Sequence, residues 1–215
     1  MTPPKLIIFD CDGVLVDSEH ISNQFLLDEL ASYGLTLTMA DCDSLFVGGT
    51  FTSVAKIARG MGADLPEDWV TKFYERLYPH LAIGVPMVTG VANILDRVIG
   101  LNLPHCVVTN GSVRKMKITL GQNGYWEHFQ NIQFSAHTYN VAKPDPELLL
   151  IATRYFNTDP ADCIVIDDSP SGCTGAANAG MPCIGYAERS DPEKLAATGA
   201  NVIRSMSELP SLLGL

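Results

Sequence analysis

Short apolar runs alternate with amphipathic stretches along most of the chain. Six runs have the length of buried strands, the last two with a weaker pattern: 6–9, 105–109, 163–167, 183–186, 131–135 and 201–203. Stretches with helical spacing lie between them: 89–99, 113–122, 146–156 and 170–179. Strands that alternate with helices predict an α/β fold, a Rossmann-like doubly wound parallel sheet.

The stretch between the first two predicted strands contains helices only. Its helical segments are 18–33, 39–46, 51–60 and 67–80. Ser18 can cap the first of them and Gly34 ends it. We therefore predict two domains: residues 1–17 and 85–215 form the α/β core, and residues 18–84 form an inserted helical bundle.

The composition argues against several classes of partner. The formal net charge is −10, which disfavours binding to a nucleic-acid backbone. No apolar run is long enough to span a bilayer, so no membrane partner is expected. An anionic substrate would need cations placed locally.

Cysteine usage and the first residues bear on the compartment. The six cysteines show no metal-ligand spacing, which is typical of free thiols in a reducing environment. Residues 1–5 lack the basic-then-apolar pattern of a secretory signal. We predict a cytoplasmic protein. The sequence leaves the oligomeric state open, and a monomer is compatible with it.

The first predicted strand ends in two carboxylates, Asp10 and Asp12, followed by Gly13. In an extended strand, residues two positions apart point the same way, so both carboxylates would reach the space beyond the strand. Their repulsion would be relieved by a divalent metal, and oxygen ligands of this kind suit Mg²⁺. An ordinary polar turn is an alternative. A calcium loop fits less well because the glycine comes too early.

Three further polar clusters fall at the same predicted sheet edge, where ligands of such sheets bind. Thr109 and Asn110 end one strand and open toward a helix, as a phosphate seat does. Asp167 and Asp168 end another, and Lys143 precedes a helix that begins at a proline. Taken singly, a turn, a helix cap or a surface lysine would explain each cluster. Together they supply a metal site, a phosphate seat and a compensating cation.

These motifs resemble those of the haloacid dehalogenase superfamily. The stretches that carry the resemblance are 10–19, 109–110, 143–146 and 166–169. Their order and spacing are similar to the branch of small sugar phosphatases and β-phosphoglucomutase-like members. The resemblance covers nearly the whole chain, and it implies that residues 18–84 are the family's helical cap domain.

The resemblance implies a role for each matching residue. Asp10 would be the nucleophile that forms an aspartyl-phosphate, and Asp12 would act as general acid and base. Mg²⁺ would be held by Asp10, by the backbone carbonyl of Asp12 and by Asp168, with Asp167 ligating or orienting. The transferring phosphoryl group would meet three residues: Thr109, Asn110 and Lys143. Glu19 and Gly48 would contact the substrate from the cap.

Asp12 bears on the choice among reactions within the family. Dehalogenases and phosphonate-cleaving members lack this second aspartate, so the resemblance implies phosphoryl transfer. The cap loop 47–51 carries no charge, which favours a phosphatase of a small phosphate monoester, such as a sugar phosphate. A β-phosphoglucomutase-like mutase and a catalytically idle binding module are the alternatives.

Overall fold

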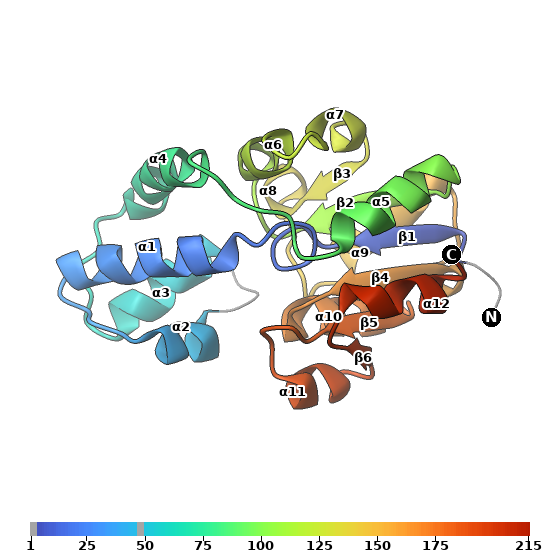
Figure 1. Ribbon diagram of the computed structural model, residues 1–215. Coiled ribbons are helices and arrows are strands. Elements are labelled where there is room, and N and C mark those ends of the chain that lie inside the picture. Colours follow the sequence, from blue (N-terminus) through green and yellow to red (C-terminus); the bar gives the residue numbers. More distant parts are fainter. Residues whose placement is uncertain (1–3, 47–49) are drawn as a thin grey trace.

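The computed structural model describes residues 4–46 and 50–215, with a six-stranded sheet at its centre (Figure 1). The strands are β1 (Leu6–Phe9), β2 (His105–Thr109), β3 (Gln133–Ser135), β4 (Cys163–Asp167), β5 (Cys183–Tyr186) and β6 (Asn201–Ile203). Their order is β3-β2-β1-β4-β5-β6, and every neighbouring pair is parallel. This confirms the predicted doubly wound α/β fold.

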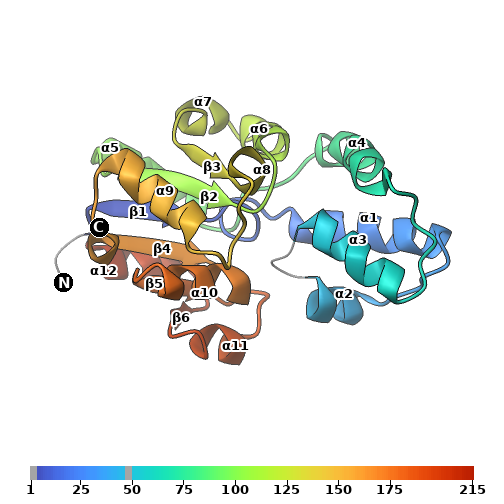
Figure 2. The same cartoon turned by 180° about the vertical axis from the view of Figure 1, so that it is seen from behind.

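Helices cover both faces of the sheet. The α-helices around it are α5 (Val91–Gly100), α6 (Val113–Gly121), α7 (Trp126–Phe129), α8 (Ala136–Tyr139), α9 (Glu147–Phe156), α10 (Pro170–Asn178), α11 (Pro192–Ala196) and α12 (Leu209–Leu213), and 3₁₀ turns occupy Pro160–Asp162 and Met206–Glu208. Figure 1 looks onto α5 and α12, and Figure 2 onto α9 and α10 on the opposite face.

Alternation along β1 divides its side chains between two apolar clusters. Ile7 and Phe9 pack with residues of α5 and α12, whereas Leu6 and Ile8 pack with residues of α9 and α10. All four side chains are fully buried. A strand covered on both faces must be apolar throughout, so the first polar position, Asp10, marks where the sheet ends.

The remaining helices lie beyond the carboxyl-terminal edge of the sheet (Figures 1 and 2). They are α1 (Glu19–Ser32), α2 (Met39–Leu45), α3 (Phe51–Gly60) and α4 (Trp69–Leu81). Their shared core is aromatic: Phe73 lies with ring centroids 4.5 Å from Phe51, 4.8 Å from Trp69 and 5.4 Å from Phe25. The division of the chain into domains at 17/18 and 84/85 stays a prediction.

Helix α4 contacts α6 and the residue before it. Tyr78 on α4 shares a buried 2.7 Å hydrogen bond with the hydroxyl of Ser112, and the Arg114 guanidinium lies 4.6 Å from the Tyr78 ring centroid.

Within the described residues, no helix is both long and apolar enough to cross a membrane.

Candidate active site

The end of β1 is built around a tight turn at Gly13. The Asp10 amide continues the sheet by donating to the Ile166 carbonyl at 2.9 Å, and the chain then turns away. Gly13 has φ +79°, and a Cβ atom there would lie 2.1 Å from the Asp168 carboxylate. Only glycine fits both the backbone angle and the space. The turn brings β1 against Asp168 at the end of β4.

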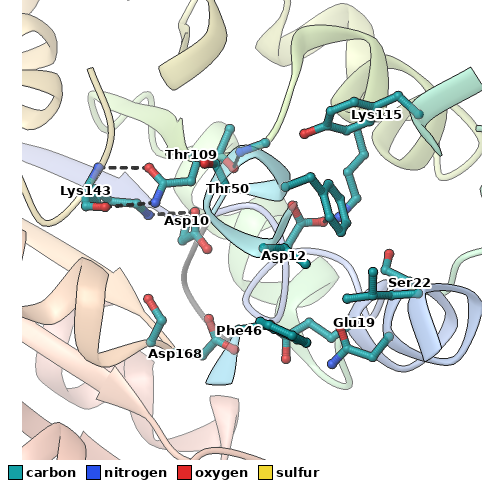
Figure 3. A pocket seen from close by; sticks show the side chains of 18 residues that line it. Asp10, Asp12, Glu19, Ser22, Phe46, Thr50, Thr109, Lys115, Lys143 and Asp168 are labelled. Atoms are coloured by element: carbon teal, nitrogen blue, oxygen red, sulfur yellow. Dashed lines mark hydrogen bonds and ion pairs between the residues drawn. The ribbon is translucent and has the colours of Figure 1, made fainter. Parts of the chain in front are cut away.

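Lys143 is one of two buried lysines in the site. Its Nζ donates to Asp10 Oδ1 at 2.8 Å (Figure 3). It also donates to Asp167 Oδ2 at 2.6 Å and to the Val108 carbonyl at 3.1 Å. Burial lowers the pKa of this ammonium, but the two carboxylates outweigh that effect and raise it. Lys143 therefore stays charged and fixes one oxygen of Asp10.

Asn110 holds the segment that carries Lys143. Its side-chain amide donates to the Lys143 carbonyl at 3.0 Å, and its side-chain oxygen accepts from the Lys143 amide at 2.8 Å. This pair of bonds joins the end of β2 to the 142–146 segment, 33 residues away in sequence. The Asn110 side chain is therefore a brace for Lys143, which the sequence did not predict.

Three buried carboxylates meet at the sheet edge. Asp10, Asp167 and Asp168 each offer an oxygen, and these oxygens lie within 4.8 Å of one another. Burial raises the pKa of Asp10 to about 7, since the nearby Asp167 and Asp12 oppose the effect of Lys143, and burial likewise raises the pKa of Asp168. Carboxylates this close and this buried are an oxygen-ligand set for a cation.

The two members of the aspartate pair after β4 differ in their partners. Asp167 is fully buried; one oxygen binds Lys143, and the other accepts from the amide and hydroxyl of Ser169. In the described part of the chain, no hydrogen bond or ion pair is seen on the Asp168 carboxylate, which is 5% exposed. Asp168 is thus the carboxylate that most needs a cation.

Asp12 faces a different set of partners from those of Asp10. Lys115 on α6 donates to Asp12 Oδ1 at 2.8 Å, and the Ser18 hydroxyl donates to the same oxygen. Lys115 is 8% exposed; burial lowers the pKa of its ammonium, but the surrounding groups, Asp12 foremost, leave that pKa above its usual value. Ser18 was expected to cap α1, but its hydroxyl makes no capping bond and binds Asp12 instead.

These residues line one cavity of about 110 Å³ between the sheet edge and the helices α1, α3 and α4 (Figure 3). The predicted site residues on its wall are Asp10, Asp12, Glu19, Thr109, Asn110, Lys143 and Asp168. Thr109 Oγ1 accepts from the Gly111 amide at 2.9 Å, which shapes the loop after β2. Asp167 lies behind the wall, and Gly48 lies outside the described residues.

Sequence reasoning missed part of the wall. The additional lining residues are Ser22, Asn23, Leu26, Phe46, Thr50, Phe51, Val54, Tyr74, Gly111, Lys115 and Ser169. Most come from α1 to α4, where periodicity marks an apolar face but does not separate core positions from cavity positions. Lys115 lies only five residues after Asn110. Its closeness to the Thr109–Asn110 motif is the one feature of the sequence that could have placed it in the site.

Comparison with known proteins identifies the family. The profile of the haloacid dehalogenase-like hydrolases matches residues 7–186, most of the chain. The chain belongs to this family. Several curated relatives are named phosphatases. Together with the family match, they confirm the expected enzyme class, a phosphoric monoester hydrolase.

Three similar proteins cover nearly the whole of this haloacid dehalogenase-like chain. The 6-phosphogluconate phosphatase of Escherichia coli is 26% identical over 99% of this chain and 96% of its own length. A haloacid dehalogenase-like protein of unknown function from Agrobacterium tumefaciens is 30% identical, with TM-score 0.83 over 98% and 97% of the two chains. A family hydrolase from Deinococcus radiodurans, solved with bound phosphate and sodium, is 26% identical, with TM-score 0.80 over 100% and 96%.

Proposed function

We propose that this protein is a Mg²⁺-dependent phosphatase of a small phosphate monoester that works through an aspartyl-phosphate on Asp10. The observation that carries the proposal is the separation of two aspartates within one cavity. Asp10 lies in the buried cluster with Lys143 and Asp168. Asp12 lines the same cavity but forms its ion pair with Lys115. A nucleophile and an acid–base group need those two different surroundings.

In the first step, a carboxylate oxygen of Asp10 attacks phosphorus, and the bond from phosphorus to the ester oxygen breaks. Asp12 gives its proton to that departing oxygen. In the second step, Asp12 takes a proton from water, the water oxygen attacks phosphorus, and the bond to Asp10 breaks. Inorganic phosphate and an alcohol are the products, and both aspartates return to their starting forms.

The charges of the site support a divalent cation. Four carboxylates face two lysines, so the ionised cluster carries two uncompensated negative charges before a phosphate dianion arrives. Asp10, Asp168 and the backbone carbonyl of Asp12 would hold Mg²⁺, which neutralises charge on the transferring group. Asp167 would orient rather than ligate, because both its oxygens are already bonded to Lys143 and Ser169.

The transferring phosphoryl group would lie against Thr109, the backbone amide of Asn110 and Lys143. Glu19 would contact the substrate from α1, and Gly48, which lies outside the described residues, is proposed to contact it as well. The bound phosphate of the Deinococcus radiodurans hydrolase shows that a relative of this fold takes such a ligand. By analogy with the Escherichia coli relative, a phosphorylated sugar or sugar acid is the favoured substrate class.

The cavity favours a phosphatase over a phosphosugar mutase. A mutase must hold a second phosphate on its cap side. In the part of the chain that the structure describes, the cations on the cavity wall are Lys143 and Lys115, and carboxylates already engage both. The side chains of α3 on the wall, Phe51 and Val54, are apolar. We further propose a cytoplasmic enzyme whose partner is a small metabolite, with no nucleic acid or membrane.

The test is phosphate release from a panel of sugar phosphates, sugar-acid phosphates, glycerol phosphate and nucleotides, with Mg²⁺ and with EDTA. Metal-dependent release from one or a few monoesters is expected. Full activity in EDTA would remove the metal assignment. Conversion of β-glucose 1-phosphate to glucose 6-phosphate without phosphate release would make the protein a mutase.

Asp10→Asn tests the covalent step. The amide cannot form an acyl phosphate, so turnover should fall by roughly three orders of magnitude or more. Circular dichroism and thermal unfolding should show that the variant is folded. Wild-type enzyme quenched in acid during turnover of a ³²P-labelled substrate should carry label on protein, and Asp10→Asn should carry none. Label that persists in the variant would place the phosphoenzyme elsewhere.

A further inference from the structure

A buried hydroxyl without a hydrogen-bond partner lies on the cavity wall. Ser22, on α1, is 4% exposed, and among the described residues its Oγ is one of three buried side-chain polar atoms that find no partner. The other two belong to Trp69 and Gln133, and neither residue lines the cavity. Ser22 is therefore the one unsatisfied group of this kind that a substrate could meet.

Such a group is unfavourable in the free protein. A buried hydroxyl loses its bonds to water, and without a protein partner nothing replaces them. A helical serine usually satisfies its hydroxyl by bonding to the carbonyl four residues earlier, here Ser18. In this structure the Ser18 carbonyl accepts from the Ser22 amide at 3.0 Å, and the Ser22 hydroxyl is left over. An alanine would fill the position without that penalty.

The location of Ser22 indicates what it would bind. In the view of Figure 3, Lys143, Asp10, Asp12 and Ser22 follow one another across the cavity. Under the proposed function, phosphorus is attacked at Asp10 and the leaving oxygen is protonated by Asp12. Ser22 then lies on the side of the alcohol that departs.

The cavity wall also carries polar groups from Glu19, Asn23, Thr50 and Tyr74, but Tyr74 already bonds to His137, and Thr50 accepts from the Ser53 amide. Phe46, Phe51 and Val54 supply apolar surface, and Asn23, adjacent to Ser22 on α1, supplies an amide. A simple alkyl leaving group would cover the apolar wall and leave the Ser22 hydroxyl unsatisfied. A leaving group with hydroxyls near the ester carbon would satisfy it.

We propose that Ser22, with Asn23 beside it, forms a hydroxyl-recognition subsite, so that the substrates are phosphate esters of polyhydroxylated alcohols rather than of alkyl or aryl alcohols. This inference rests on the proposed phosphatase function. The bond to Ser22 is neutral and directional, so it selects for a hydroxyl and not for charge. It deepens the function by naming what the leaving group must carry.

The experiment compares glycerol 1-phosphate with propyl phosphate, which has the same carbon chain without hydroxyls. The wild type should prefer glycerol phosphate, and Ser22→Ala should reduce the ratio of the two kcat/KM values by about 5- to 10-fold, the worth of one neutral hydrogen bond. Ser32→Ala, in an exposed serine of the same helix, is the matched control and should leave the ratio unchanged. The melting temperature of Ser22→Ala should equal or exceed that of the wild type.

Two results would overturn the inference. One is a wild type without preference for glycerol phosphate; the other is a ratio that Ser22→Ala does not change. Hydrolysis of p-nitrophenyl phosphate, which also requires Asp10, is measured in parallel. If it persists while the ratio test fails, the subsite is wrong and the phosphatase stands. If the wild type with Mg²⁺ releases phosphate neither from these three esters nor from the panel of sugar phosphates, the proposed function itself fails.

Discussion

At the scale of single residues, two aspartates two positions apart line the same cavity and have different partners. Asp10 continues the sheet and meets Lys143, whereas Asp12 follows the turn toward α1 and meets Lys115 and Ser18. Each carboxylate thus has its own buried lysine. Lys115 also lines the cavity, but its bond to Asp12 Oδ1 makes it a positioning residue for that carboxylate.

Lys115→Met keeps the length of the side chain and removes its charge and hydrogen bonds. Asp12 then loses one of its two anchors and protonates the leaving oxygen less effectively. Hydrolysis of an alkyl ester such as glycerol phosphate should slow by about tenfold or more. The kcat/KM for p-nitrophenyl phosphate, which reports only the step that forms the phosphoenzyme, should fall much less, because nitrophenolate departs without a proton.

Lys117→Met, at an exposed lysine of the same helix, controls for loss of charge on α6. Asp12→Ala should show the same difference between the two substrates as Lys115→Met, only larger. If Lys115→Met slows both esters equally, the lysine supports the fold and does not position Asp12.

At the scale of elements, α10 must approach β4 closely for the site to form. Gly172, in the first turn of α10, leaves room for Asp167: a Cβ atom there would lie 1.8 Å from the Asp167 carboxylate. Asp167 cannot move aside because Lys143 and Ser169 hold both its oxygens. The glycine is thus required by packing and not by backbone conformation.

Gly172→Ala should therefore destabilise the protein by about 1–3 kcal/mol and reduce activity. Gly175→Ala is the matched control on the same helix, because its Cβ would make ordinary contacts at 3.6 Å or more. Alanine has the higher helix propensity, so the control should be up to about 1 kcal/mol more stable than the wild type. Chemical denaturation of both variants measures the difference. Equal stabilities would contradict the packing argument.

Elements also show how far the sequence predicts this structure. The four inner strands β1, β2, β4 and β5 were predictable, because a strand buried on both faces reads as an apolar run. The edge strands β3 and β6 gave a weaker pattern, because they are short and begin with the polar residues Gln133 and Asn201. The short helices α7, α8, α11 and α12 were not, since four or five residues carry too little periodicity. In the site, carboxylates at strand ends were predictable from the sheet rule. Lys115 was not, because a lysine on an amphipathic helix usually faces solvent.

At the scale of the whole molecule, the two ends of the sheet contain different titratable clusters. The aspartates lie at the carboxyl end. At the amino end, His105 at the start of β2 stacks on His128 of α7, with ring centroids 4.7 Å apart and Nε2 atoms 2.5 Å apart. His105 Nδ1 lies 2.6 Å from the Leu103 carbonyl, so that nitrogen carries a proton. The facing Nε2 atoms therefore share one proton, and a second one would place two N–H groups against each other.

Protonation of this pair should lower stability as the pH falls. Burial lowers the pKa of both histidines. A positive charge on His128 lowers the pKa of His105 further. The unfolded chain, with histidine pKa near roughly 6.5, then binds more protons than the folded protein, so stability is lost as the pH drops from roughly 7.5 to 5.5. Asp10 and Asp168, whose pKa values are raised, act with the opposite sign in the metal-free protein. The comparison must therefore be between a variant and the wild type at each pH.

His128→Gln retains a polar group beside His105 and removes one titrating ring. With EDTA present, its melting temperature should fall less than that of the wild type between pH 7.5 and 5.5, because fewer protons bind on unfolding. His20→Gln, at an exposed histidine of α1, should follow the wild type. A His128→Gln curve parallel to the wild type would mean that the stacked pair already accepts its protons in the folded state. The sheet end opposite the active site would then make no contribution to the acid sensitivity of the fold.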